Sequence, residues 1–254
     1  MGKLEGRVAI VTGGAKGIGQ HYARALAAEG ARVMIGDIAD GSGLAADIVK
    51  AHGPDAAASH SFDVSDEAAV KGLVEATLDG FGRIDILVNN AALYATLPPV
   101  KCTEIEVDLW DRVMAVNVRG PFLMVKHVAP HMQARQSGKI INIASGTAYK
   151  GLPDFLHYVT SKGAMVAFTR ALSRELGAHK ICVNTLAPGL ILSETGLTNT
   201  AHLDQARAGV IASRAIKRDG YPEDLIGALV FLASGDSDFV TGQTIAVDGG
   251  SINT

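Results

Sequence analysis

Cysteine is scarce in this sequence, and neither sign of charge is in large excess. The two cysteines, Cys102 and Cys182, do not have the spacing of metal ligands, and such sparse use favours a reducing compartment. With 23 basic and 26 acidic residues the net charge is −3, so the chain lacks the basic surface typical of proteins that bind nucleic acid or anionic membranes. We therefore expect neither as a partner.

Long apolar runs are also missing. The first residues, MGKLEGRVAIVTGG, contain no apolar stretch of the signal-peptide kind, and no run approaches the roughly 20 residues that cross a bilayer. The histidines at positions 21, 60, 127 and 202 do not group with other metal ligands. These absences predict a cytoplasmic protein without a metal site.

What the chain has instead is a regular alternation of short apolar runs with amphipathic stretches. Hydrophobic residues make up 48% and charged residues 19%, which excludes a disordered chain. Seven runs lack polar alternation, which is typical of strands buried on both faces. They occupy residues 7–12, 31–37, 56–63, 83–90, 139–145, 180–188 and 243–250. Helical patterns include 17–29, 65–80, 104–133, 157–178 and 222–233.

This alternation predicts a single α/β domain over residues 1–254. Its core is expected to be a doubly wound, mainly parallel sheet of seven strands with helices on both faces. Residues 190–220 lie outside the alternation, between the sixth and seventh strand candidates. A segment that long in a compact domain is typical of a lid over a substrate.

The first strand leads directly into a glycine-rich segment, TGGAKGIG (12–19), and a helical pattern begins at about Gly17. Glycines allow a sharp turn and let phosphates approach the N–H groups at a helix N-terminus. Glycine clusters are common in loops. Here, however, a strand precedes, a helix follows, and Asp37 ends the second strand twenty residues after Gly17. Together these features predict a dinucleotide site.

Asp37 bears on which dinucleotide binds. A carboxylate at this position accepts hydrogen bonds from the adenosine ribose and repels a 2′-phosphate, which favours NAD over NADP. Lys16 exerts a weaker pull in the opposite direction. The alternative interpretation of Asp37 is a helix cap or a turn residue.

Three further polar residues follow strands at the same edge of the sheet. Asp63 can meet the adenine amino group, or it can cap the helix that starts near Ser65. Asn89 and Asn90 can bind the cofactor, join neighbouring strands, or do both.

Tyr158 and Lys162 are four residues apart in a predicted helix and therefore share a face. A tyrosine has a pKa of about 10, and an adjacent ammonium or a positively charged nicotinamide lowers it toward the range useful for proton exchange. Ser145 ends the fifth strand and can bond a substrate carbonyl. Alone, the Tyr–Lys pair is typical of a helix surface and the serine of a turn, so the prediction depends on their combination.

Asn117 lies within the long helical pattern, four residues before Pro121. Proline has no N–H to bond the Asn117 carbonyl, so we expect a kink and a carbonyl able to hold water on a proton path from Lys162. The alternative is a proline kink without a function.

The motifs together resemble the short-chain dehydrogenase/reductases. TGGAKGIG, NNAA (89–92), Asn117, Ser145, YVTSK (158–162) and the turn at 188–189 have the order and spacing of that family, from LEGRVAIVTGG to TGQTIAVDGG. The resemblance implies a Rossmann-type fold and a catalytic set. In that set Tyr158 is the acid/base, Lys162 lowers its pKa and holds the ribose, Ser145 orients the substrate, and Asn117 completes the relay.

The same resemblance and the glycine motif give a cofactor-binding set. Its members are Gly13, Ala15, Lys16, Gly17, Ile18, Gly19, Asp37, Ile38, Asp63, Val64, Asn90, Ala91, Tyr158, Lys162, Pro188, Gly189, Ile191 and Ser193. Two positions depart from the family pattern. Ala92 replaces the usual glycine of NNAG, and Ser193 stands for the usual threonine and keeps its hydroxyl.

The expected activity is hydride transfer between NAD(H) and a small or medium secondary alcohol or its ketone. We expect Gly146, Thr147, Leu152, Phe155, Tyr94 and the lid to line a mainly apolar substrate pocket, with the charged residues Arg207, Arg214, Lys217 and Arg218 on a solvated face. Two alternatives stay open: a 3-oxoacyl-thioester reductase and a non-catalytic dinucleotide sensor. The family resemblance also implies a homotetramer built on helices 104–133 and 157–178 and the C-terminal strand.

Overall fold

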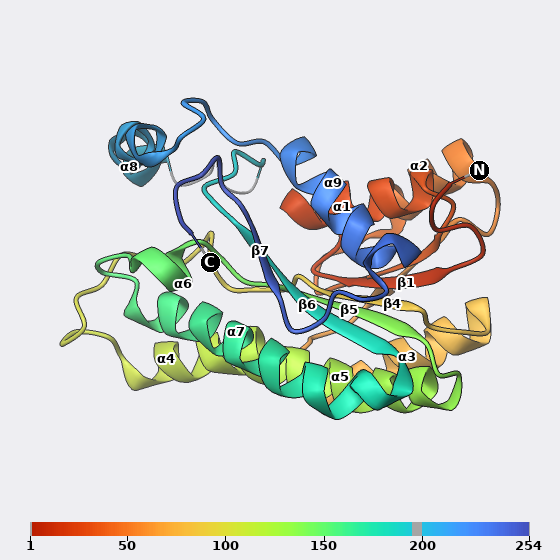
Figure 1. The fold of residues 1–254 in the computed structure, drawn as a ribbon. Coiled ribbons are helices and arrows are strands. Elements are labelled where there is room, and N and C mark those ends of the chain that lie inside the picture. The colour runs from red at the N-terminus through yellow and green to blue at the C-terminus, as the bar shows by residue number, and fades with distance from the viewer. Residues whose placement is uncertain (1, 195–199, 254) are drawn as a thin grey trace.

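The computed structural model describes residues 2–194 and 200–253, and for residues 200–206 the backbone alone. Seven strands in this part of the chain form one sheet in the order β3-β2-β1-β4-β5-β6-β7, and every pairing is parallel (Figure 1). The strands are β1 (Val8–Thr12), β2 (Arg32–Asp37), β3 (Ala57–Ser61), β4 (Ile86–Asn89), β5 (Gly138–Ile143), β6 (Ile181–Pro188) and β7 (Thr244–Val247). Each coincides with a predicted run, and the mainly parallel sheet is confirmed.

Helices cover both faces of the sheet, as predicted. In β1, Ala9 and Val11 pack on one face against α1 (Gly17–Ala28), α2 (Ser42–His52) and α9 (Glu223–Ala233). Val8 and Ile10 pack on the other against α3 (Glu67–Phe81), α5 (Gly120–Ala134) and α7 (Leu156–Leu176). Figure 1 shows these two layers on opposite sides of the strands. All four β1 side chains are fully buried, which explains why the run does not alternate with polar residues.

The predicted helix 104–133 is interrupted by a π-helical turn. It consists of α4 (Val107–Met114), the π turn Ala115–Arg119 and α5. The Gly120 N–H bonds the carbonyl of Ala115, five residues earlier, and Pro121 follows within the first turn of α5. The kink expected near Asn117 is therefore a widened turn, which accommodates a proline that has no N–H to donate.

The amino ends of the central strands are held by a buried carboxylate. Asp85 is fully buried and accepts hydrogen bonds from the Val8 N–H at 2.9 Å and from the guanidinium groups of Arg83 and Arg135, both at 2.6 Å from its Oδ1. Burial alone would raise the pKa of Asp85, but these donors hold the pKa below its usual range. This network anchors the end of the sheet opposite the carboxyl edge.

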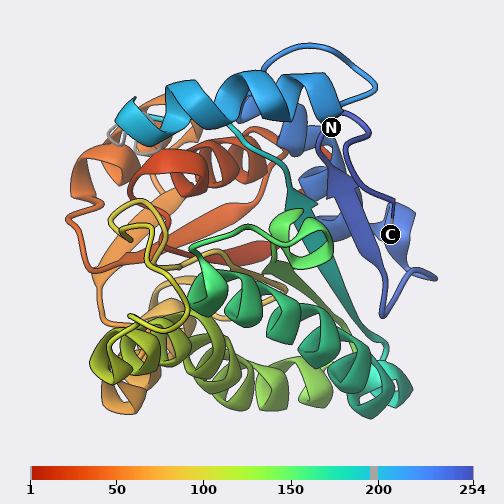
Figure 2. The ribbon, with the colours of Figure 1, turned by 90° about the vertical axis from the view of Figure 1, so that its left-hand side faces the viewer.

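The remaining helices lie at the carboxyl edge. They are α6 (Thr147–Lys150) and α8 (Thr200–Ser213), which belongs to the segment predicted as a lid. Figure 2 looks onto this edge and shows α8 and α7 on opposite sides with α6 between them. Residues 195–199 of the predicted lid lie outside the described residues. Of the described helices, none combines the length and the apolar character needed to span a bilayer.

Candidate active site

A cavity of about 640 Å³ opens at the carboxyl ends of the strands. Its walls come from the segments that follow all seven strands, and they surround the crevice between β1 and β4 where the strand order reverses. Of the predicted site residues, Ala15 and Asn117 alone do not line it. The others in its wall are Gly13, Lys16, Gly17, Ile18, Gly19, Asp37, Ile38, Asp63, Val64, Asn90, Ala91, Ser145, Tyr158, Lys162, Pro188, Gly189, Ile191 and Ser193.

The glycine turn between β1 and α1 forms one end of the cavity. Gly13 and Gly17 have φ angles of 61° and 56°, a region that favours glycine. A Cβ on Gly13 would lie 2.8 Å from the Cα of Ala91, and one on Gly19 would collide with the Gly13 carbonyl oxygen. The helix α1 begins at Gly17 as predicted, and its N-cap residue, Lys16, makes no side-chain capping bond. The first N–H groups of α1 are thus left for an anion, which fits a dinucleotide phosphate.

Asp37 ends β2 and supports the glycine turn. Its Oδ2 accepts the Ala15 N–H at 3.0 Å and its Oδ1 accepts the Ala39 N–H at 2.9 Å. The turn role that the sequence left open therefore holds. Each carboxylate oxygen has a second lone pair, so Asp37 can also accept a ribose hydroxyl. The adjacent Ile38 lines the cavity with 76% of its surface exposed, which gives an apolar wall beside that carboxylate.

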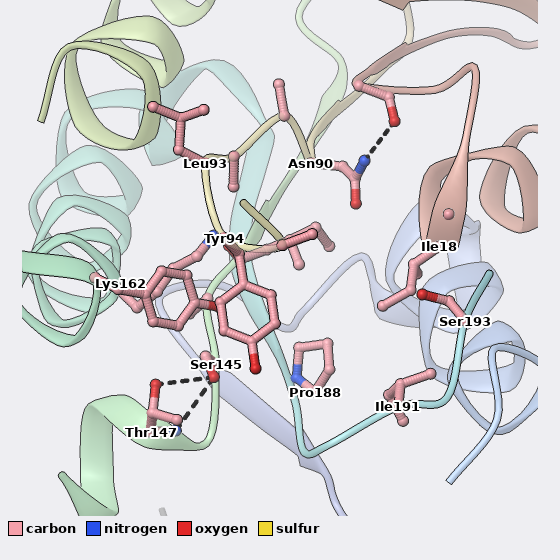
Figure 3. A pocket seen from close by; sticks show the side chains of 18 of the residues that line it. Ile18, Asn90, Leu93, Tyr94, Ser145, Thr147, Lys162, Pro188, Ile191 and Ser193 are labelled. Atoms are coloured by element: carbon pink, nitrogen blue, oxygen red, sulfur yellow. Dashed lines mark hydrogen bonds between the residues drawn. The ribbon is translucent and has the colours of Figure 1, made fainter. Parts of the chain in front are cut away.

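The residues after β3 and β4 hold loops in place. Asp63 Oδ1 accepts the N–H and the hydroxyl of Ser65 at 2.8 and 2.7 Å, a local turn; the capping role considered for Asp63 is wrong, because α3 begins at Glu67 and is capped by Asp66. Asn89 donates to Asn142 Oδ1 at 2.8 Å and so joins β4 to β5. Asn90 donates to the carbonyls of Thr12 and Gly13 at 3.0 and 2.9 Å, which ties the β4 loop to the glycine turn; Figure 3 draws one of these two bonds.

Tyr158 and Lys162 lie on one face of α7 and are both buried in the cavity wall. The Lys162 ammonium donates to the Ile143 carbonyl at 2.7 Å and lies 5.8 Å from the centre of the Tyr158 ring. Burial lowers the pKa of Lys162 to about 8. Burial, and then the neighbouring Tyr94, raise the pKa of Tyr158, while a hydrogen bond with Ser145 opposes the rise. Burial is thus the largest influence on the pKa of Tyr158 in this structure, and the lowering of that pKa by Lys162 stays a prediction.

Ser145 follows β5 and faces the same cavity. Its Oγ accepts the N–H of Thr147 at 3.2 Å and the Thr147 hydroxyl at 3.0 Å, as Figure 3 shows. Both bonds use oxygen lone pairs, so the Ser145 proton remains to be donated. The serine thus starts α6 and can still act as a donor in the cavity.

Asn117 is buried behind the cavity wall. Its Oδ1 accepts the Leu93 N–H at 2.7 Å, and its Nδ2 donates to the Leu93 carbonyl at 3.2 Å and to Ser161 Oγ at 3.0 Å. The Ser161 hydroxyl in turn donates to the Tyr158 carbonyl at 2.7 Å. The Asn117 side chain therefore connects the β4 loop with the turn of α7 that carries Tyr158.

The substrate end of the cavity is where sequence reasoning was least complete. The expected wall residues are all present: Gly146, Thr147, Leu152, Phe155 and Tyr94, together with Leu190, Val210 and Arg214 from the predicted lid. The stacking of Tyr94 on Tyr158, with ring centres 4.7 Å apart, was not foreseen. Lys150, Asp248 and Ser251 also line the cavity without having been predicted, since no local pattern marks them.

Arg214 corrects one expectation. The sequence predicts a solvated face for Arg214, but only 3% of its surface is exposed, and its guanidinium donates to the carbonyls of Leu190 and Arg218, both at 2.6 Å. The other residues of that group, Arg207, Lys217 and Arg218, are exposed as expected. Among the described residues, no group of three or more His, Cys, Asp or Glu side chains could hold a metal ion.

Comparisons with known proteins match almost the whole chain. A family model described as Enoyl-(Acyl carrier protein) reductase matches residues 13–251. Galactitol 2-dehydrogenase of Agrobacterium fabrum is 40% identical to this chain, with 98% of both chains covered. A 3-oxoacyl-(acyl-carrier-protein) reductase of Thermotoga maritima is 36% identical, with 98% of this chain and 99% of the relative covered.

Two solved structures have the same fold along nearly their full length. A putative short-chain alcohol dehydrogenase from Sinorhizobium meliloti superposes with a TM-score of 0.91 at 32% identity, covering 98% of this chain and 97% of the other. Levodione reductase superposes with a TM-score of 0.90 at 30% identity, covering 97% of each. These similarities extend over both the glycine turn and the Tyr158 region.

Proposed function

Because the chain belongs to the short-chain dehydrogenase/reductase family, we propose that it is an NAD(H)-dependent oxidoreductase acting on a small or medium secondary alcohol and its ketone. Members of this family are oxidoreductases that bind a nicotinamide dinucleotide and act on small molecules. The observation that carries the proposal is that the glycine turn, Asp37 and the buried Tyr158–Lys162 pair all line one cavity.

The glycine-turn end of the cavity supports the proposal that a dinucleotide binds there. When bound, a nicotinamide dinucleotide supplies the hydride acceptor or donor, with a positive charge in its oxidised form. We assign phosphate binding to the N–H groups at the start of α1, and ribose binding to Asp37 and Lys162. The negative charge of Asp37 favours NAD over NADP. The rest of the proposed binding set is Gly13, Ala15, Lys16, Ile18, Ile38, Asp63, Val64, Asn90, Ala91, Tyr158, Pro188, Gly189, Ile191 and Ser193. Of these, Ala15 acts through the bond of its N–H to Asp37, since it does not line the cavity.

Tyr158 is proposed as the group that takes the proton from the alcohol. Its pKa is raised by burial, so the phenolate needs nearby positive charge. Lys162 supplies part of that charge, and its pKa of about 8 means that the ammonium form declines above that pH. Ser145 donates its remaining proton to the substrate oxygen, which then lies between the serine and the tyrosine.

Asn117 is proposed as a positioning residue. Its side chain holds Leu93 and Ser161, and through Ser161 the backbone of Tyr158. The water relay expected at the Asn117 carbonyl stays a prediction. The π turn at Asn117 supports it, because single π turns within α-helices occur frequently at functional sites.

Reduction of 3-oxoacyl thioesters is the second candidate activity. It is favoured by the similarity to the Thermotoga reductase. A third hypothesis, a non-catalytic dinucleotide sensor, is disfavoured because both Tyr158 and Lys162 are present and face the cavity.

The proposal is tested by a panel of secondary alcohols, sugars and 3-hydroxyacyl thioesters, each offered with NAD and with NADP. We expect NADH to appear with a secondary alcohol, and NAD to give the higher kcat/KM. Turnover confined to acyl thioesters with NADPH would instead identify the second candidate activity. No turnover in either direction would contradict the proposal that this protein is an enzyme.

We also propose the homotetramer and the cytoplasmic location. Phe122 of α5 and Leu156 of α7 are large apolar side chains about half exposed, on the helices expected to form subunit contacts. Light scattering after size exclusion measures the oligomeric mass, and a monomer would contradict the tetramer.

A further inference from the structure

The substrate end of the cavity contains a cation held by two serine hydroxyls. Lys150, the last residue of α6, donates from Nζ to Ser213 Oγ at 2.9 Å and to Ser251 Oγ. The two serine hydroxyls are themselves 2.6 Å apart. Lys150 and Ser251 line the cavity, and Ser213 ends α8. We call these three residues the Lys150 cluster. Its members come from three separate parts of the chain, which converge only at this wall.

The cluster has no counter-ion. In the described part of the chain, no carboxylate forms an ion pair with Lys150. Asp248 lines the same cavity, but its Oδ1 accepts the N–H groups of Gly250 and Ser251, both at 3.0 Å, and it does not reach Lys150. The second cation of the wall, Arg214, is occupied by two backbone carbonyls. Lys150 is thus the one cation of this wall whose partners are only hydroxyls.

The position of the cluster follows from α6. This short helix starts at Thr147, whose N–H and hydroxyl bond Ser145, and Lys150 lies one turn further on. A substrate oxygen held between Ser145 and Tyr158 therefore lies at one end of α6, and the ammonium lies at the other. The cavity wall near this path is apolar, with Leu152 and Phe155. This arrangement suits a molecule with polar groups at both ends and carbon between them.

We propose that the Lys150 cluster binds the carboxylate of the substrate, so that the alcohol oxidised by this protein is a hydroxy acid with its carboxylate several bonds from the carbinol carbon. This inference rests on the proposed function. In the reaction, the carbinol carbon gives its hydride to NAD and its oxygen gives a proton to Tyr158, which leaves an oxo acid whose carboxylate is unchanged. The ammonium can donate to the carboxylate, and the Ser251 hydroxyl can turn to do the same, whereas the Ser213 hydroxyl donates to the Val210 carbonyl at 2.8 Å and holds the ammonium through a lone pair.

The experiment compares hydroxy acids of increasing length with their primary amides, which have the same shape without the charge. With the full-length enzyme and NAD, we expect kcat/KM at the best length to be about tenfold or more higher for the acid, as one charge-assisted hydrogen bond gives. Lys150→Met should remove most of this acid-to-amide ratio, and Lys150→Arg should retain much of it. Lys217→Met is the matched control and should leave the ratio unchanged, because Lys217 lies in the next segment, is exposed and does not line the cavity.

Two results would overturn the inference. One is an acid-to-amide ratio near one for the unaltered enzyme at every length. The other is an equal loss of kcat/KM for acid and amide in Lys150→Met, which would make the cluster a structural tie between α6, α8 and the C-terminal segment. If the enzyme still oxidises neutral alcohols, either of these results leaves the proposed function unaffected. Absence of turnover with all alcohols, charged and neutral, would overturn the proposed function and this inference with it.

Discussion

The cofactor preference can be tested at Asp37, whose carboxylate has two separable tasks. One is electrostatic, because its negative charge opposes a 2′-phosphate. Two like charges about 4 Å apart repel by about 4 kcal/mol at an effective dielectric of 20, and solvent at a partly exposed site reduces this to about 1–3 kcal/mol. The other is structural, because Asp37 accepts the Ala15 and Ala39 N–H groups.

Asp37→Asn and Asp37→Ala separate the two tasks. Asn removes the charge and keeps one acceptor oxygen, so the ratio of kcat/KM for NAD over NADP should fall by roughly 5- to 100-fold with little change in Tm. Ala removes both acceptors and should lower the free energy of unfolding by a further amount, about 1–3 kcal/mol. The assay is NADH and NADPH formation with one alcohol, together with thermal unfolding. An unchanged cofactor ratio in Asp37→Asn would refute the electrostatic reasoning.

Four further outcomes are expected. Tyr158→Phe should lower kcat by at least about a hundredfold while NADH binding, followed by fluorescence titration, persists; undiminished turnover would remove the phenol from the reaction. Gly19→Ala should abolish NADH binding, because its Cβ would collide with the Gly13 carbonyl, and retained binding in the same titration would show that the turn can shift. Asp85→Ala should lower the free energy of unfolding in denaturant by about 1–3 kcal/mol, since the Val8 N–H and the partly exposed guanidinium groups of Arg83 and Arg135 lose a charged acceptor; an unchanged free energy of unfolding would contradict that role. The pKa of Asp85 is lower in the folded than in the unfolded protein, so its contribution to the free energy of unfolding is present above the unfolded pKa and is lost as pH falls through the folded value. Denaturant unfolding measured from neutral pH down to acid should therefore show this loss of stability only below about pH 4. The Asp85→Ala variant should not show it.

Much of the fold could be predicted from the sequence, because its strands are buried on both faces. Such strands read as continuous apolar runs, and all seven runs became strands. The helix α2 was missed because only Leu44, Ala45 and Ile48 of its eleven residues are buried, too narrow a stripe to detect. The π turn was also missed, since Pro121 predicts a disturbance but not its form.

Part of the candidate site could also be predicted from the sequence, and part of it could not. The glycine turn, Asp37 and the Tyr158–Lys162 pair can be recognised from the spacing of nearby residues in the sequence, and the fold brings them together in one cavity. The Lys150 cluster carries none, because its serines lie 63 and 101 positions away along the chain. The raised pKa of Tyr158 has no local signal either, since burial is a property of the packed cavity and not of the Tyr–Lys spacing.

The bonds of Asn90 and Asn117 have a consequence for how such a protein can diversify. Asn90 fastens the β4 loop to the glycine turn, and Asn117 fastens the same loop to α7 through Leu93 and Ser161. The glycine turn, the β4 loop and the turn of α7 that carries Tyr158 are thereby connected by hydrogen bonds. Lys150 is not part of these bonds, because its hydrogen bonds go to Ser213 and Ser251. We therefore expect substitutions at Lys150 to change which molecules the cavity accepts without loosening the bonds that join the glycine turn, the β4 loop and α7.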